Sequence, residues 1–343
     1  MAEETKMSVG DGKGEEEVKV ILFYRYHDID DEAMIEWHKD HCARLGLLGR
    51  VLIAKEGING TLAGPPLAID EYIALMRAKP GFEDVDWKTS TASSQPFPDL
   101  FIKPVPEIIN TGNLIPADFS NAGVHLPPKE FHKKLSELLN KKEEGKDFVL
   151  LDVRNYFEYD IGHFDGAIHP EMKAFSQYPQ YIEKHLDQFE NKPVMMYCTG
   201  GIRCEKASAF LKAKGVDEVY QLKGGIHRYL EQFPDGGLWA GKNFVFDKRV
   251  AMAPEEQPKD RAVVGTCLEC AVPYDELSGD RVCTVCRGPV LICPACNDKL
   301  WELHCTTHQH LKRCYFTDLS PFSEEELKAQ RKELQVLHTE LLQ

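Results

Sequence analysis

The chain has 343 residues, of which 43% are hydrophobic, and its formal net charge is −14. This length allows two or three domains with real cores, and no apolar stretch approaches the ~20 residues that a membrane-spanning helix requires. The negative charge argues against indiscriminate binding of nucleic acid, although it leaves room for one specific basic face. Composition therefore excludes a membrane protein and a non-specific nucleic-acid binder.

Residues 1–17 are polar and acidic, and they lack the apolar middle of a signal peptide. We expect them to form a disordered tail. The chain also contains eleven cysteines. Without an export signal, these indicate metal binding or catalysis rather than disulfides. We therefore expect a protein of the reducing cytoplasm.

Residues 18–112 show the pattern of a ferredoxin-like α+β domain. The apolar run at residues 18–26 predicts a strand, and Asp30 or Asp31 can cap a helix that ends near residue 45. Further elements are expected at residues 49–62 (strands that turn near 57–60), 67–78 (helix), 85–91 and 100–104 (strands). This β-α-β-β-α-β order is ferredoxin-like, an arrangement that does not by itself give a function.

Residues 113–130 contain three prolines and predict a linker. Residues 131–235 alternate expected helices with short apolar strands, at 148–153, 194–197 and 219–222. This alternation is typical of a parallel α/β domain, in which sites form beyond the carboxyl ends of the strands. Asp152 and Arg154 follow one such strand. We expect them to act structurally, through an ion pair such as that of Arg154 with Glu158 four residues on.

Cys198 lies in a glycine-bearing turn between a short strand and a helix that begins near Cys204. Gly200 and Gly201 let the loop curl with positive φ and bring backbone N–H groups close to the sulfur. Those amides, the helix N-terminus and Arg203 all favour a thiolate. We therefore predict that Cys198 is a nucleophile whose negative charge is stabilised by Arg203, Gly200 and Gly201.

The length of this loop limits what it can bind. Cysteine phosphatases hold phosphate in a Cys-x5-Arg loop, whereas the segment from Cys198 to Arg203 is one residue shorter. A phosphate-sized group should fit poorly, and a single sulfur atom carried as a persulfide should fit better. Cys204 follows at the start of the helix, where core packing and a role as a second thiol are both open.

Residues 266–316 hold eight of the eleven cysteines and predict a small module folded around metal. Two Cys-x2-Cys pairs, separated by twelve residues, have nearly the spacing of a zinc ribbon: Cys267 with Cys270, and Cys283 with Cys286. Together they can close one tetrahedral site, and a loop this small buries too little apolar surface to fold alone. Reduced cysteines without metal are the alternative.

A second set of ligands begins with Cys293 and Cys296. One further zinc ion needs two more ligands, for which Cys305 with Cys314 or His308 are the candidates. Interleaved ligation between the two sets is also open. We expect a structural rather than a catalytic zinc, because four thiolates leave no free coordination position.

Basic residues gather around the cysteine loop in spite of the overall negative charge. Lys206, Lys223 and Arg228 are the predicted RNA contacts, since phosphate contacts from such a patch position an RNA. A solvated helix face is the alternative. Residues 236–265 are expected to form a connector. Residues 317–343 predict a charged helical tail with a modest apolar stripe.

Several motifs resemble those of known families. Three of them resemble the entry motif, the active-site loop and the closing turn of rhodanese domains: residues 152–168, 198–203 and 222–226. Longer segments resemble the bacterial tRNA uridine hydroxylases of the TrhO family: residues 49–60, 196–208 and 241–247. The similarity covers about residues 18–316, so chance is a poor explanation.

The resemblance implies a rhodanese-like fold for residues 131–235 and oxygen-dependent hydroxylation of the wobble uridine of tRNA, which gives 5-hydroxyuridine. Cys198 would be the essential nucleophile, O2 a co-substrate and tRNA the partner. A thiolate that adds to the uracil ring would raise electron density at C5, where oxygen enters. One departure concerns the second metal site, because His304-Cys305 stands where the family has adjacent cysteines.

Two other functions compete with this hypothesis. The first is a sulfurtransferase, in which Cys198 takes sulfane sulfur from a donor such as thiosulfate and passes it to an acceptor. The loop alone supports this function as well as it supports hydroxylation, and only the flanking motifs favour the latter. The second is a binding module whose zinc region recruits a protein, which the intact Cys198 loop disfavours.

Overall fold

The computed structural model describes residues 17–143, 147–256, 263–300 and 302–311, together with Ser323 and Glu325. The chain forms two compact units, residues 1–262 and residues 263–343. The predicted disordered tail, except Glu17, and the predicted helical tail, except Ser323 and Glu325, lie outside the described residues. No helix within the described ranges is long and apolar enough to cross a membrane.

The first unit begins with a five-stranded sheet in the order β4-β1-β3-β2-β5. Its strands are β1 (Val18–Tyr26), β2 (Leu48–Ala54), β3 (Gly57–Gly64), β4 (Lys88–Ala92) and β5 (Leu100–Pro104). Helices α1 (Asp31–Arg44) and α2 (Pro66–Arg77) follow β1 and β3. The predicted β-α-β-β-α-β order is confirmed, with β5 added parallel to β2. Asp30 caps α1 by accepting a hydrogen bond from the N–H of Ala33 at 3.0 Å.

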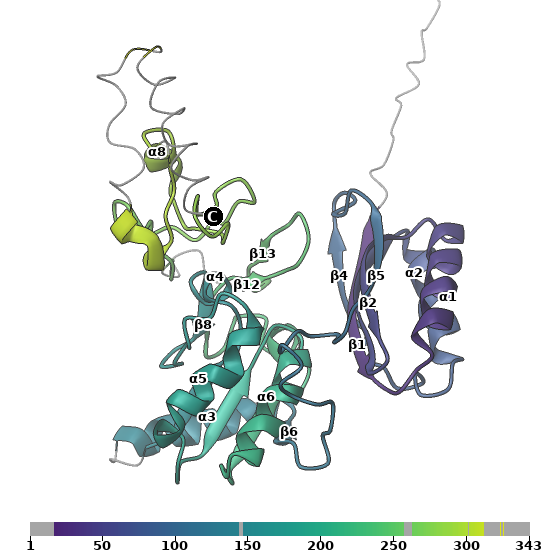
Figure 1. Cartoon of the computed structure of the whole chain (residues 1–343), viewed down its shortest axis with the longest axis horizontal. Coiled ribbons are helices and arrows are strands. Elements are labelled where there is room, and N and C mark those ends of the chain that lie inside the picture. The colour runs from purple at the N-terminus through teal and green to yellow at the C-terminus, as the bar shows by residue number, and fades with distance from the viewer. Residues whose placement is uncertain are drawn as a thin grey trace, which may run out of the picture. The chain divides into compact units, whose positions relative to one another are not determined.

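Alternation of side chains along the strands gives this sheet two different faces. One face packs against α1 and α2, which lie together on the same side of the sheet (Figure 1), and it buries Ile21, Phe23, Val51 and Ile53. The other face carries side chains that line a cavity: Leu22, Tyr24, Arg50, Leu52, Asn59, Thr61, Phe101 and Lys103. The second face is the one that contributes to the functional site.

The rest of the first unit is built on a four-stranded parallel sheet in the order β6-β10-β9-β7. Its strands are β6 (Val124–Leu126), β7 (Val149–Asp152), β9 (Val194–Tyr197) and β10 (Val219–Leu222). Its helices are α3 (Pro128–Glu143), α4 (Tyr156–Tyr159), α5 (Tyr178–Lys184), α6 (Ile202–Ala213) and α7 (Gly225–Gln232). The predicted parallel α/β fold is therefore confirmed.

Strand β6 lies inside the stretch that the sequence predicts as a linker, residues 113–130, and it pairs in parallel with β10. Its three residues, followed by two prolines, are too short to give a recognisable strand pattern. Smaller elements complete the unit: β8 (Gly162–Phe164), β11 (Trp239–Gly241), β12 (Asn243–Phe244), β13 (Ala251–Met252), η1 (Phe175–Gln177) and η2 (Leu186–Gln188).

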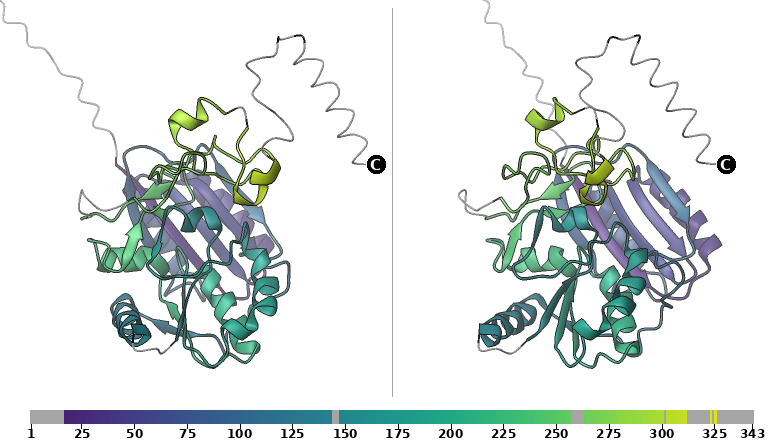
Figure 2. Two further views of the ribbon diagram at one scale, coloured as in Figure 1. Left: turned by 90° about the vertical axis from the view of Figure 1, so that its left-hand side faces the viewer. Right: turned by 60° about the vertical axis from the view of Figure 1, so that its left-hand side comes forward.

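The second unit has little regular structure, as Figure 2 shows. Its described helical elements are α8 (Pro294–Asn297) and η3 (Thr306–Leu311). Two tight turns repeat the same geometry: Cys267 donates its N–H to Val272 O at 2.9 Å, and Cys283 donates its N–H to Gly288 O at 2.8 Å. Isolated bridges next to these turns are the only β pairing within the described part of this unit.

Candidate functional site: a cysteine loop facing a cavity

Cys198 follows β9 directly, and α6 begins four residues later at Ile202. Gly201 takes the left-handed conformation, with φ at 106°, which a side chain would oppose. This turn aims the N–H of Gly201 at the Cys198 sulfur, 3.1 Å away. The strand end and the helix start therefore form the amide cradle that the sequence predicts for this thiol.

The surroundings of Cys198 favour its ionised form. Burial alone would raise the pKa of this thiol. The hydrogen bond from the Cys204 thiol, the charge of Arg203 and the amides of Cys204 and Gly201 outweigh burial and lower the pKa to about 6. Burial raises the pKa of Cys204 well above its usual value, so Cys204 stays protonated and can donate. Cys198 is thus a thiolate at neutral pH.

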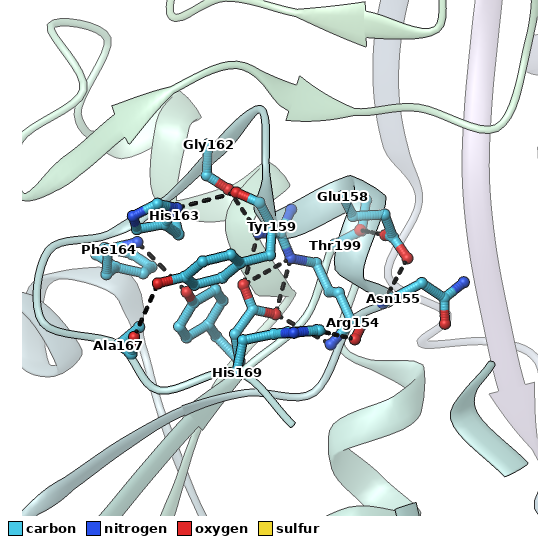
Figure 3. Close-up of polar contacts among 12 residues, drawn as sticks. Arg154, Asn155, Glu158, Tyr159, Gly162, His163, Phe164, Ala167, His169 and Thr199 are labelled. Carbon is cyan, nitrogen blue, oxygen red and sulfur yellow. Dashed lines mark hydrogen bonds and ion pairs between the residues drawn. The ribbon is translucent and has the colours of Figure 1, made fainter. Parts of the chain in front are cut away.

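Arg203 is bound to a carboxylate that the sequence does not single out. Its guanidinium donates to both carboxylate oxygens of Glu158, at 2.6 and 2.8 Å. Glu158 also accepts a hydrogen bond from the Thr199 hydroxyl at 2.9 Å, and Figure 3 shows these two residues. Burial would raise the pKa of Glu158, but Arg203 holds it below its usual value. Glu158 therefore fixes the arginine beside the loop and balances its charge.

Arg154 has the structural role that the sequence favours, but its expected pairing with Glu158 is wrong. The Arg154 guanidinium binds Asp152, with Nη2 to Oδ2 at 2.6 Å, and it also donates to Gly162 O at 2.6 Å (Figure 3). Both side chains are fully buried. The reason is the turn after β7, which folds Arg154 back onto Asp152 and leaves Glu158 facing Arg203.

A cavity of about 640 Å³ adjoins the loop. One wall belongs to the cysteine loop and its neighbours, namely Asn155, Thr199, Gly200, Ile202, Arg203 and Phe246. The facing wall is the second face of the five-stranded sheet, with Asn110 and Ile109 beside it. This volume lies within the roughly 300–1,000 Å³ that small-molecule sites span. The cavity is therefore large enough for a nucleotide-sized ligand.

Strand β1 covers the loop itself. A Cβ atom placed on Gly200 would lie 3.1 Å from Leu22 Cδ2, and one placed on Gly201 would lie 2.9 Å from the Tyr24 hydroxyl oxygen. Cys198 has no exposed surface. Both glycines are therefore required for close packing against β1 as well as for the turn, and the sulfur lies just behind the cavity wall.

Two of the three predicted RNA contacts serve a different purpose. Lys206 is fully buried and pairs with Glu56 at 3.0 Å and Glu107 at 2.8 Å. Arg228 binds Asp86 at 2.6 Å and is half-buried. These two cations join the parallel α/β domain to the ferredoxin-like domain and its following segment, so they do not form a free basic face. Lys223 is exposed, and its RNA contact stays a prediction.

The second unit contains two clusters of metal-ligating side chains. Cys267, Cys270, Cys293 and Cys296 form one, and Cys283, Cys286, Cys305 and His308 form the other. Within each cluster the ligand atoms lie within 4.8 Å of one another. Tetrahedral sets of four thiolates, or of three thiolates and one imidazole, are the donor sets that Zn²⁺ prefers. The clusters therefore fit zinc by number, type and proximity.

This grouping corrects the sequential pairing of the first two Cys-x2-Cys motifs. The turn at Cys267 shares its cluster with the third motif, at Cys293, and the N–H of Cys293 donates to the Cys267 sulfur at 3.3 Å. The interleaved arrangement thus brings together ligands that are distant in the sequence. Cys314, one of the predicted ligands, lies outside the described residues. His308 is the fourth side chain of the second cluster. The ten described cysteines form no disulfide.

Comparison with family models gives three matches along the chain. Residues 18–108 match the UPF0176 acylphosphatase-like domain, residues 133–232 the rhodanese-like domain, and residues 240–310 the rhodanese C-terminal region. These matches follow the order of the ferredoxin-like sheet, the cysteine-loop domain and the metal-ligand clusters described above.

Curated relatives share most of this chain. A tRNA uridine(34) hydroxylase of Onion yellows phytoplasma is 40% identical, over 86% of this chain and 90% of that protein. Its counterpart in Corynebacterium diphtheriae is 36% identical, over 84% of this chain and 93% of that protein. Rhodanese-like domain-containing protein 6 of Arabidopsis thaliana is 38% identical, over 83% of this chain but only 52% of the plant protein. The chain belongs to the tRNA uridine(34) hydroxylase family of rhodanese-domain proteins.

Proposed function

We propose that this protein hydroxylates C5 of the wobble uridine of tRNA, with Cys198 as the nucleophile and O2 as co-substrate. The observation that carries the proposal is that the loop whose Gly201 amide donates to the Cys198 sulfur also forms one wall of a nucleotide-sized cavity. The lowered pKa of this thiol, about 6, agrees with a nucleophilic role. Relatives that carry the name tRNA uridine(34) hydroxylase and span most of the chain support the choice of substrate.

The chemistry follows from the polarity of uracil. Its C6 is electrophilic because it is conjugated with the C4 carbonyl, so a thiolate can add there. The addition converts C5 into a nucleophilic enolate carbon, which is the position that gains oxygen. Loss of the C5 proton and cleavage of the C6–S bond then restore the C5=C6 double bond and free the Cys198 thiolate. Overall, one atom of O2 is inserted into the C5–H bond and the other leaves as water, which consumes two protons and two electrons from a separate reductant.

The chain's own residues supply the thiolate steps of this sequence. The amides of Gly201 and Cys204, the Cys204 thiol and the charge of Arg203 stabilise the sulfur anion before addition and after elimination. Glu158 keeps Arg203 in place. Since Cys198 has no exposed surface, we expect β1 or the loop to shift when the uracil ring enters.

The two ligand clusters of the second unit are proposed to hold structural zinc. A closed four-ligand shell leaves no position for substrate, so the ions would stabilise the fold of the unit and take no part in oxygen chemistry. We further propose that the protein acts in the cytoplasm, where tRNA and reduced thiols are both available.

Mass spectrometry of tRNA nucleosides tests the function directly. We expect 5-hydroxyuridine to disappear from the tRNA of a strain that lacks the gene, to return with the wild-type gene, and to stay absent with Cys198→Ser. Cys42→Ser is the matched control, because Cys42 is equally buried but packs in the core of the ferredoxin-like domain. Normal 5-hydroxyuridine in the Cys198→Ser strain would overturn the proposed role of this thiol.

A thiosulfate–cyanide assay separates hydroxylation from sulfur transfer. The amide cradle can also hold a persulfide on Cys198, so the loop geometry alone does not distinguish the two reactions. We expect slow thiocyanate formation by the wild-type protein. Fast thiocyanate formation that is lost in Cys198→Ser, together with unchanged tRNA nucleosides in the deletion strain, would establish a sulfurtransferase instead.

A further inference from the structure

We propose that the Arg50–Phe101 corner of the cavity is a stacking subsite for the nucleotide next to the target uridine. The inference rests on the proposed function, because it takes single-stranded RNA as the ligand. It assigns to the ferredoxin-like sheet a part in substrate recognition that the cysteine loop cannot supply alone.

Among the phenylalanines that the structure describes, only two are exposed, and both line this cavity. Phe101 on β5 is 47% exposed, and Phe246, after β12, is 48% exposed. Both line the same cavity, Phe101 on the sheet and Phe246 beside Thr199 and Arg203 of the cysteine loop. Single exposed apolar side chains are common on protein surfaces, but two half-exposed rings that line one cavity form an apolar patch of the kind that marks a ligand-binding groove.

Each ring has a guanidinium nearby. The Arg50 guanidinium carbon lies 5.8 Å from the centroid of the Phe101 ring, and that of Arg203 lies 5.9 Å from the centroid of Phe246. Arg50 is held in this position by the carbonyl oxygens of Gly49 and Asp99, each at 2.8 Å, and by the Asp99 carboxylate. The position of Arg50 is therefore set by the protein before any ligand binds.

A flat ring beside a fixed cation matches the two parts of a nucleotide. Aromatic side chains stack on unpaired bases, and neighbouring arginines or lysines contact the backbone phosphate. Exposed Lys103 lies two residues beyond Phe101 on the same face of β5, so it adds a second cation at this corner. Asn59 and Asn110, which also line the cavity, carry amides of the kind that read base edges.

The cavity has room for two such bases. Phe246 lies on the wall formed by the cysteine loop, so the target uracil would bind on that side and would reach Cys198 after the shift expected of β1 or the loop. Phe101 lies on the facing wall, which the sheet forms. The adjoining nucleotide of the anticodon loop would therefore stack on Phe101, with its phosphate near Arg50 and Lys103. A mononucleotide would engage only the loop side, whereas an anticodon hairpin would engage both.

Binding of a synthetic anticodon stem-loop RNA tests this subsite. Measurements use Cys198→Ser protein, so that affinity does not depend on turnover. Base–aromatic stacking is worth about 1–3 kcal/mol, so Phe101→Leu should raise the Kd of the hairpin about fivefold or more, and Phe101→Trp should restore it. Binding of uridine monophosphate should not change. Leu67→Ala is the control, because Leu67 is an 84% exposed apolar residue on α2 of the same domain.

Fluorescence locates the base more directly. A 2-aminopurine placed next to the target uridine should be quenched on binding, and the quenching should be lost in Phe101→Leu but kept in Leu67→Ala. Hairpin binding or quenching that is unchanged by Phe101→Leu would overturn the subsite while leaving hydroxylation by the wild-type protein intact. Absence of 5-hydroxyuridine, with hairpin binding that still depends on Phe101, would overturn the proposed function and leave the subsite.

Discussion

The two units of this protein use cysteine in opposite ways. In the first unit a single thiolate, Cys198, is stabilised by backbone amides, a neighbouring thiol and an arginine that are all part of a preformed fold. In the second unit seven cysteines and His308 converge in two clusters, each of which could hold a metal ion. A thiolate held by the fold is available for chemistry, whereas a thiolate consumed by coordination serves stability. The same residue type therefore says little until its surroundings are known.

Removal of ligands from the second unit should give the largest effect. Apparent zinc-binding free energies of about 10–16 kcal/mol serve as folding energy in small zinc modules, so losing one ion should unfold part of this unit. The double variant Cys270→Ser/Cys296→Ser removes two ligands from one interleaved cluster and should retain one zinc per chain. Cys270→Ser/Cys286→Ser damages both clusters and should lose both ions. Elemental analysis measures the number of zinc ions per protein chain.

The same pair of variants separates interleaved from sequential ligation. If Cys267, Cys270, Cys283 and Cys286 shared one ion, the Cys270→Ser/Cys286→Ser protein would keep a zinc ion, and the other double variant would lose both. That reversal would contradict the clusters described here. In both cases Cys198 should keep its reactivity if the first unit folds independently, which alkylation of this thiol can check.

Glu158→Gln should destabilise the first unit by about 3–5 kcal/mol, because it leaves the buried charge of Arg203 without its carboxylate. Chemical denaturation followed by circular dichroism measures this loss. Glu183→Gln is a suitable control, since Glu183 forms an exposed pair with Lys214 and should change stability by less than about 1 kcal/mol. Equal effects of the two substitutions would mean that Arg203 does not depend on Glu158.

Lys206→Met should also destabilise the protein, by about 3 kcal/mol, since it leaves Glu107 and Glu56 without their shared cation. Arg228→Gln should cost less than about 1 kcal/mol, because its pair with Asp86 is partly exposed to solvent. Denaturant titrations of the two variants measure both changes in the free energy of unfolding. A role in RNA binding would show the opposite pattern, with unchanged stability and weaker tRNA binding.

Local signals in the sequence were sufficient for much of this architecture. The strand–glycine–helix pattern predicts the loop around Cys198 because every contributing amide lies within seven residues of the sulfur. The ferredoxin-like order is readable for the same reason, since each element carries its own periodicity. Cys-x2-Cys spacing likewise predicts that metal ligands gather in the second unit.

Contacts between distant segments could not be predicted in this way. Glu158 and Arg203 are 45 residues apart, and Lys206 and Glu107 are 99 apart, so no local pattern pairs them. A lysine on a helix looks the same in the sequence whether it meets RNA or a buried carboxylate. The sequence does not reveal the interleaved clusters for a related reason. The spacing within each Cys-x2-Cys motif determines its own turn, but it does not determine which two turns come together around one ion.

The smallest expected effect concerns the acidity of Cys198. Its pKa of about 6 lies below the ordinary value of 9, so the alkylation rate with iodoacetamide should rise with pH and reach half its maximum near pH 6. Cys204→Ala removes one donor to the thiolate and should raise this midpoint by about one pH unit, since a hydrogen bond to a charged group contributes about 1.5 kcal/mol or more. Cys42→Ala should not move it.

The absolute rate and the midpoint report different properties of this site. Because Cys198 has no exposed surface, alkylation should be slower than for a free thiol of the same pKa, at every pH.

Ionisation of Cys198 also makes the stability of the protein depend on pH. Its pKa is lowered in the folded state, so the folded state is favoured when the thiol is ionised. The ionised Cys198 thiolate contributes to the free energy of unfolding in full above about pH 9. This contribution declines as the pH falls and is gone below about pH 6. A midpoint near pH 9 would show that the amide cradle does not hold a thiolate, and the role proposed for the loop would fail with it.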